Sequence, residues 1–150
     1  MSLLGSVSLG RIVFTARALP AIRPVTHLVD GDRVIIRTDR DAAIISELRA
    51  RAGAVVAYEA DAIDTAEHLG WSVIVVGLAH RVIDPDQAAF YRGVLRPWVS
   101  GAKDQVIAIH ADMVTGFRLV ADGAAALNRA DNAAVRDTDP SVIGGGPAAG

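Results

Sequence analysis

Two apolar, β-branched segments meet at the dipeptide Asp30-Gly31, and this junction constrains the fold more than any other feature of the chain. Asp-Gly supplies the positive φ angles that a tight hairpin turn needs. The sequence therefore predicts two antiparallel strands, one on each side of the dipeptide. Polar and cationic groups interrupt these otherwise apolar strands at Arg23, Thr26-His27 and Arg37-Thr38.

An arginine in a largely buried strand costs free energy unless an anion pairs with it. We expect Arg23 and Arg37 to face each other, or nearly so, across the hairpin. One interpretation is an anion clamp for a bound phosphate. In this clamp, Thr38 adds a hydroxyl, and the helix after Asp39 adds backbone N–H groups. The other interpretation is a neighbouring carboxylate or a solvated surface strand, and the residues alone leave both open.

Short β-type segments recur along the chain, and only two segments have helical spacing. Beyond the hairpin, the pattern predicts strands over residues 10–16, 54–60, 71–83, 105–110 and 115–120. Helices are predicted over residues 42–52 and from Asp84-Pro85 to about residue 95. We expect Leu19-Pro20 to break the pattern, residues 61–70 to form a polar connector and Gly77 to mark a bulge or sharp bend. About seven strands joined by short links favour a mainly β fold, an antiparallel sheet closed into a small barrel.

Composition limits the classes of partner and site. The chain has 150 residues, of which 51% are hydrophobic and 21% charged, as in one compact domain. We assign this domain to residues 1–120 and expect residues 121–150 to be a weakly ordered or disordered tail. The net charge of −2 argues against nucleic acid or an anionic membrane as the main partner. Cysteine is absent and the four histidines are scattered, so we expect no disulfide and no metal site. No secretory signal is visible, and the cytoplasm is the expected location.

Several blocks, in order, resemble the pyridoxamine 5′-phosphate oxidase-like family, in particular its actinobacterial members. The blocks are Leu9-Gly10-Arg11-Ile12-Val13-Phe14, Pro24-Val25-Thr26-His27-Leu28-Val29-Asp30-Gly31, Val34-Ile35-Ile36-Arg37-Thr38, Val56-Ala57-Tyr58-Glu59-Ala60-Asp61, Gly70-Trp71-Ser72-Val73 and Thr115-Gly116-Phe117-Arg118-Leu119. Together they span about residues 3 to 120. The resemblance implies a flavin-binding split β-barrel of six to seven antiparallel strands with two short helices. It also implies a homodimer that holds FMN at the subunit interface.

The resemblance also implies a set of cofactor-binding residues. It places Arg23, Val25, Thr26 and His27 along the flavin ring and ribityl chain. The remaining residues are Arg37 and Thr38 near the phosphate, Trp71 and Ser72 close to the ring, and Arg40 as a substitute for a lysine. The chain departs from the family pattern where Thr26 replaces an asparagine. It departs again where Asp39-Arg40-Asp41-Ala42 replaces a Gly-Ser-Lys-like phosphate segment. From the residues alone, Glu59 and Asp61 could be paired carboxylates, but we expect an ion pair with a nearby arginine instead.

Two functions follow as hypotheses. The first is an oxidoreductase that uses FMN, or alternatively a deazaflavin coenzyme, on an unknown small organic substrate. In that case the redox chemistry belongs to the cofactor, and the protein supplies binding and orientation. The second is a non-catalytic cofactor- or ligand-binding protein on the same barrel. The segment 39–42 divides the two, because added carboxylates weaken binding of a phosphate.

Overall fold

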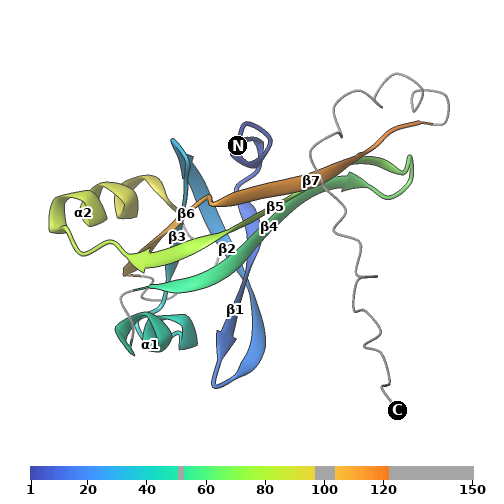
Figure 1. Cartoon of the computed structure of the whole chain (residues 1–150). Coiled ribbons are helices and arrows are strands. Elements are labelled where there is room, and N and C mark those ends of the chain that lie inside the picture. The colour runs from blue at the N-terminus through green and yellow to red at the C-terminus, as the bar shows by residue number, and fades with distance from the viewer. Residues whose placement is uncertain (51–52, 97–103, 122–150) are drawn as a thin grey trace, which may run out of the picture. The chain divides into compact units, whose positions relative to one another are not determined.

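The computed structural model describes residues 1–50, 53–96 and 104–121 (Figure 1). Residues Met1–Leu119 form one compact unit, and Val120–Gly150 are assigned to a second. Of the expected tail, 121–150, only residue 121 is described. The division into a barrel and a weakly ordered tail therefore stays a prediction.

The sheet is a closed barrel of six antiparallel strands with a seventh strand added to it. Its elements are η1 (Leu4–Ser6), β1 (Leu9–Ala16), β2 (Leu19–Asp30), β3 (Arg33–Thr38), α1 (Ala43–Ala50), β4 (Ala54–Asp64), β5 (Leu69–Arg81), α2 (Pro85–Val94), β6 (Gln105–His110) and β7 (Met113–Leu119). The strand order is β4-β1-β2-β3-β6-β5-β7, and a further β4–β5 pairing closes the barrel. The predicted mainly β barrel with two short helices is thus confirmed.

The hairpin at Asp30-Gly31 forms, with its turn one residue further along. Asp30 pairs with Arg33, so the two turn residues are Gly31 and Asp32, and Gly31 has a φ of 63°. That conformation is available to glycine at little cost. The shift by one residue changes which side chains lie opposite one another on β2 and β3.

Two sequence expectations about chain breaks are wrong. Leu19-Pro20 does not end a strand, because the turn lies at Arg17 and Ala18, with φ angles of 52° and 63°. Pro20 is tolerated in β2 because the ladder to β3 includes only residues 27–30 of that strand. Residues 61–70 are also not a connector. The β4–β5 ladder runs without interruption to the pair Asp64↔Leu69, so the two strands form a long hairpin.

Strand β5 changes partners along its length. Its residues 70–76 pair with β7, and its residues 79–81 pair with β6. Gly77 lies at the change, where a Cβ atom would be 1.7 Å from the carbonyl oxygen of His110. The bend expected at Gly77 is therefore a site of close backbone approach that only glycine permits.

Two hydrophobic clusters lie on opposite sides of the sheet at β3. The barrel core contains Val34 and Ile36, together with three buried residues of α1, Ile44, Ile45 and Leu48. On the other side, Ile35 packs with Val106 and Ala108, with the buried α2 residues Ala88 and Tyr91, and with Leu95 at the C-cap of α2. Asp84 caps α2 by accepting a hydrogen bond from the Gln87 amide at 2.8 Å, as its sequence predicts. In the described part of the chain, no helix has the length and apolar character to cross a membrane.

Candidate functional site

A small hollow opens between β1–β3 and the start of α1, and we call it the cup. Its volume is about 130 Å³. Its lining includes Ile12, Phe14, Arg23, Pro24, Val25, Ile36, Thr38, Asp39 and the residues 42–44. A volume of this size is far below that of a pocket for a whole organic ligand and fits one small chemical group.

Arg23 supplies the positive charge of the cup. Its Nη1 donates a hydrogen bond to the Ile22 carbonyl at 2.7 Å, and it makes no ion pair with any described residue. The buried Thr38 supplies a hydroxyl, and residues 42–44 at the start of α1 also line the hollow. An arginine with free donors, a hydroxyl and a helix start together suit an anionic oxygen group.

Arg37 lies on the other side of the sheet. Its Nη1 donates hydrogen bonds to the carbonyl oxygens of Leu95 at 2.6 Å and Arg92 at 2.9 Å, at the C-terminal end of α2. Burial lowers the pKa of Arg37, the charge of Arg92 lowers it further, and Asp104 partly opposes both. The expectation that Arg23 and Arg37 face each other is therefore wrong. Arg23 pairs with Ile12 of β1 and points into the cup, whereas Arg37 holds the end of α2.

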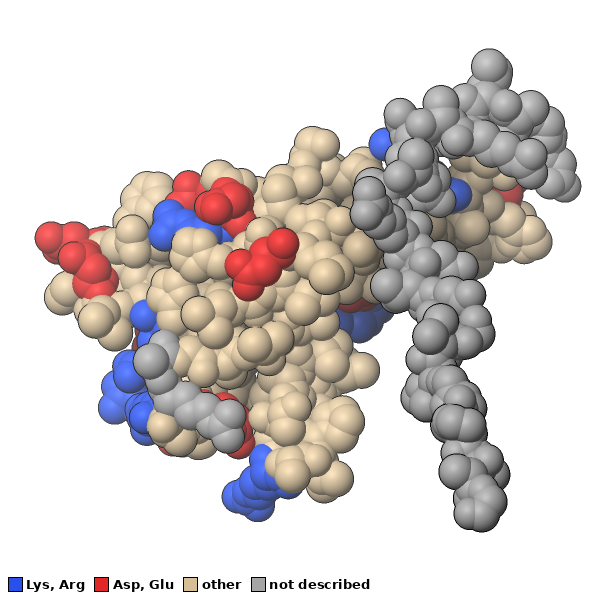
Figure 2. Space-filling model, in the orientation of Figure 1, with Lys and Arg blue, Asp and Glu red and all other residues tan. Residues whose placement is uncertain are grey.

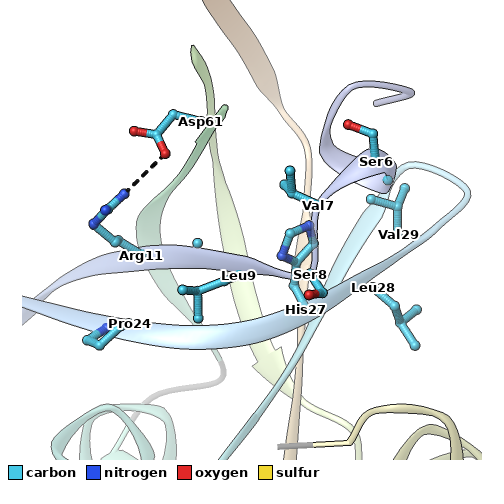
Figure 3. A pocket seen from close by; sticks show the side chains of 12 residues that line it. Ser6, Val7, Ser8, Leu9, Arg11, Pro24, His27, Leu28, Val29 and Asp61 are labelled. Atoms are coloured by element: carbon cyan, nitrogen blue, oxygen red, sulfur yellow. Dashed lines mark ion pairs between the residues drawn. The ribbon is translucent and has the colours of Figure 1, made fainter. Parts of the chain in front are cut away.

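A larger, open groove of about 710 Å³ lies beside η1, β1 and β2 (Figure 3). One wall is the segment 5–11, and the others are formed by Pro24, His27, Leu28, Val29 and Asp61. Pro24 lines both the groove and the cup. It pairs with Arg11 whereas Arg23 pairs with Ile12, so Pro24 and Arg23 point to opposite faces of β2. This volume falls within the range of small-molecule sites.

A polar cluster borders the groove at Arg11. Its guanidinium lies 2.9 Å from Glu59 and 3.7 Å from Asp61, so the expected ion pair with an arginine is confirmed. The hydrogen bond and the charge of Glu59 raise the pKa of Arg11. Ser72 donates to the same Glu59 carboxylate at 3.2 Å. Ser72 therefore lies near one end of the groove, while Trp71 must point to the opposite face of β5 and packs at the margin of the barrel core.

His27 is a core residue whose two ring nitrogens are both occupied. Nε2 lies 2.9 Å from the Leu4 carbonyl, and Nδ1 lies 2.7 Å from the Tyr58 hydroxyl. Because a carbonyl only accepts, the proton sits on Nε2 and Tyr58 donates to Nδ1. Burial lowers the pKa of His27, and burial also raises the pKa of Tyr58. A ligand would meet the edge or backbone of His27 rather than a free ring nitrogen.

The predicted site residues thus do not form one cluster. The cup gathers Arg23, Val25 and Thr38. Thr26 is buried on β2 opposite Leu9, which lines the groove. Arg40 forms an ion pair with Asp104 at 2.9 Å. Their roles in binding a cofactor stay predictions.

Four contributors to the site were missed in the sequence. The wall formed by residues 5–8 has no motif of its own, and neither the Tyr58 hydroxyl on His27 nor the Asp104 partner of Arg40 leaves a local signal. Arg11 could have been found, because strand alternation puts it on the face opposite the buried Ile12. Over the described ranges, no group of three or more His, Asp or Glu side chains is placed to hold a metal ion.

Comparisons with known proteins agree with this architecture. The family model described as pyridoxamine 5′-phosphate oxidase matches residues 1–121. The uncharacterized protein Rv0080 of Mycobacterium tuberculosis is 56% identical over 124 residues, which cover 81% of this chain and 82% of that protein. The FAD binding protein from Mycobacterium smegmatis is 31% identical, with a TM-score of 0.62 over 79% of this chain and 90% of that chain. A FAD-binding protein from Mesorhizobium loti shares the fold, with a TM-score of 0.64 over 79% of this chain and 91% of that chain at 17% identity. The chain therefore belongs to the pyridoxamine 5′-phosphate oxidase family.

Proposed function

We propose that this protein binds a flavin-type cofactor, FMN or alternatively a deazaflavin coenzyme, with a phosphate group in the cup. The observation that carries the proposal is Arg23, which lines the cup beside Thr38 and the start of α1 without an ion pair among the described residues. A phosphate would satisfy this guanidinium with charge-assisted hydrogen bonds. The relative from Mycobacterium smegmatis, described as FAD binding, supports the same ligand class.

The ring of the cofactor would lie in the groove. The groove has the volume for a ring system, which the cup lacks, and Pro24 lines both hollows. Val25, Thr26 and His27 follow Pro24 on the same strand, and Ser72 lies near the Arg11–Asp61 end of the groove. These side chains would orient the ring and exclude water from it.

The reaction class we propose is oxidation or reduction of a small organic substrate. A bound flavin supplies the redox chemistry, while the chain binds and orients it. The Arg11–Asp61 pair and the apolar walls of the groove would contact the substrate. We also propose a cytoplasmic location, because a chain without cysteine has none of the disulfides that are common in secreted proteins.

A homodimer is proposed from one exposed face of the sheet. Cross-strand pairs place Phe117 next to Ser72, and Ile74 next to Glu59, on the face that also carries Arg11. Phe117 is 54% exposed and Met113 on the same face is 58% exposed. In the view of Figure 2, charged side chains of the described residues form small mixed groups with wide uncharged surface between them.

The dimer is tested by light scattering coupled to gel filtration. We expect the mass of two chains for the native protein and of one chain for Phe117→Glu. Phe90→Glu is the control, because Phe90 is 64% exposed on α2, away from this face. A monomeric native protein, or equal dissociation by both variants, would contradict the proposed interface.

The cofactor proposal is tested by titrating flavin fluorescence with FMN and with riboflavin, which lacks the phosphate. Arg23→Gln should raise the dissociation constant for FMN by about 10-fold or more, since hydrogen bonds to charged groups contribute about 1.5–3 kcal/mol. Binding of riboflavin should not change. Arg49→Gln, which removes an exposed arginine from α1, is the control. If FMN binds no better than riboflavin to the native protein, the phosphate does not use the cup.

Binding without catalysis is the second candidate, and Asp39 favours it. This carboxylate lines the cup and opposes a phosphate electrostatically. The two functions are separated by reducing the bound flavin with light and a sacrificial donor, then adding quinone or nitroaromatic acceptors. Rapid reoxidation under nitrogen supports an enzyme, and a reduced flavin that persists with every acceptor supports a binding protein.

A further inference from the structure

The ion pair between Arg40 and Asp104 joins the segment that follows β3 to the residue that precedes β6. The two side chains meet at 2.9 Å, with 66% of Arg40 and 38% of Asp104 exposed. The second oxygen of Asp104 accepts a hydrogen bond from Gln105 Nε2 at 3.2 Å. Both carboxylate oxygens are therefore in use, and Asp104 is held where it can pair with Arg40.

The strand register brings this pair next to the cup. Thr38, the last residue of β3, pairs with Gln105, the first residue of β6. Asp39 and Asp104 flank that pair, and Asp39 lines the cup together with Thr38. Arg40, a second cation, is the next residue along the chain and does not itself line the cup.

Asp104 neutralises this second cation. The hydrogen bond from Arg40 lowers the pKa of Asp104, and Gln105 lowers it further, so the carboxylate is charged at neutral pH. Among the described residues that line the cup, Arg23 carries a positive charge and Asp39 a negative one. An exposed ion pair is weak and screened by salt, so a more highly charged anion can displace Asp104 from Arg40.

We propose that Asp104 is a specificity-determining residue: it withholds Arg40 from the cup, and a phosphate dianion recruits Arg40 by replacing the Asp104 carboxylate. This inference rests on the proposed function of the cup. It explains how a segment with two carboxylates, Asp39 and Asp41, accepts a phosphate. Singly charged or neutral groups would not break the pair and would bind more weakly.

The test compares native protein with Asp104→Asn, Arg40→Gln and the double variant in flavin titrations at low salt. Asp104→Asn should lower the dissociation constant of FMN by about two- to fivefold, the range expected for an exposed ion pair. The dissociation constant of riboflavin should not change. Arg40→Gln should lower the affinity for FMN, and in the double variant Asp104→Asn should not restore that affinity. Asp112→Asn, another exposed acid between β6 and β7, is the matched control.

Three results would overturn the inference: no gain from Asp104→Asn, an equal gain for riboflavin, or the same gain without Arg40. Thermal unfolding with inorganic phosphate separates this inference from the flavin proposal. If no flavin binds but phosphate stabilises Asp104→Asn more than native protein, and only when Arg40 is present, the flavin proposal fails and Asp104 keeps its role. If phosphate stabilises neither, both fail.

Discussion

The two sides of β3 carry arginines that are used in opposite ways. On the side covered by α2, Arg33 pairs with Asp30 at 2.6 Å and Arg37 donates to the α2 carbonyls. On the side of the cup, Arg23 reaches from β2 and makes no ion pair among the described residues. An arginine whose donors are satisfied within the chain stabilises the fold, whereas one with free donors in a hollow is available to a ligand. We therefore expect the α2 side to stabilise the fold and the cup side to bind the ligand.

The largest expected effects come from the adjacent core residues Ile35 and Ile36. Both are fully buried, and they point to opposite sides of β3. Each change to alanine should lower the free energy of unfolding in urea by about 2–5 kcal/mol. Because Ile36 lines the cup and Ile35 does not, only Ile36→Ala should also weaken FMN binding. An equal loss of FMN affinity in Ile35→Ala would show that the two sides are coupled.

The two arginines should differ in what they affect: removing Arg37 should lower stability, whereas removing Arg23 should weaken FMN binding. Arg37→Ala should cost about 1–2 kcal/mol of stability, because two carbonyl oxygens at the end of α2 lose their donor. Arg23→Ala should change stability by less than about 0.5 kcal/mol, as for an exposed surface residue, and should weaken FMN instead. The measurements are urea unfolding and flavin titration on the same preparations. A loss of FMN affinity in Arg37→Ala at unchanged stability would instead indicate that Arg37 binds the phosphate.

The smallest effect is a pH dependence on the α2 side. The rings of His80 and His110 stack with their centroids 5.2 Å apart, and burial, His110 and Arg33 lower the pKa of His80 below its ordinary value of 6.5. The unfolded chain therefore binds this proton first. The stability contributed by neutral His80 is complete above pH 6.5 and decreases as the pH falls through the lowered pKa. Burial also lowers the pKa of His27 in the barrel core, so its contribution to stability decreases with falling pH in the same way.

This linkage is measured as the unfolding temperature between pH 8 and pH 5. His80→Gln should flatten the pH dependence in part, and the rest should persist because His27 remains. His68→Asn is the control, since His68 is exposed in a turn with a φ of 54° that asparagine adopts readily. If the unfolding temperature of His80→Gln depends on pH as that of the native protein does, His80 does not contribute to the pH dependence of stability.

Local signals predicted the fold well. The Asp30-Gly31 hairpin and the Asp84 cap of α2 depend on residues a few positions apart, and both are present. The turn at Arg17 and Ala18 was missed because neither residue type signals a positive φ. The site was harder, because its contacts join residues far apart in the sequence. The separation of Arg23 from Arg37 could have been predicted, because a turn at Asp30-Gly31 would already place Arg23 opposite Thr38 and Arg37 opposite Pro24, with the two arginines on opposite faces.

The change of partners along β5 restricts how this architecture can vary. Only two residues, 77 and 78, separate the last pair with β7 from the first pair with β6. Since side chains alternate along a strand, adding or deleting one residue there would turn either Val75 or Ala79, both fully buried, out of the core. Length changes in this protein should therefore be tolerated at its turns, whereas this two-residue spacer should keep its length.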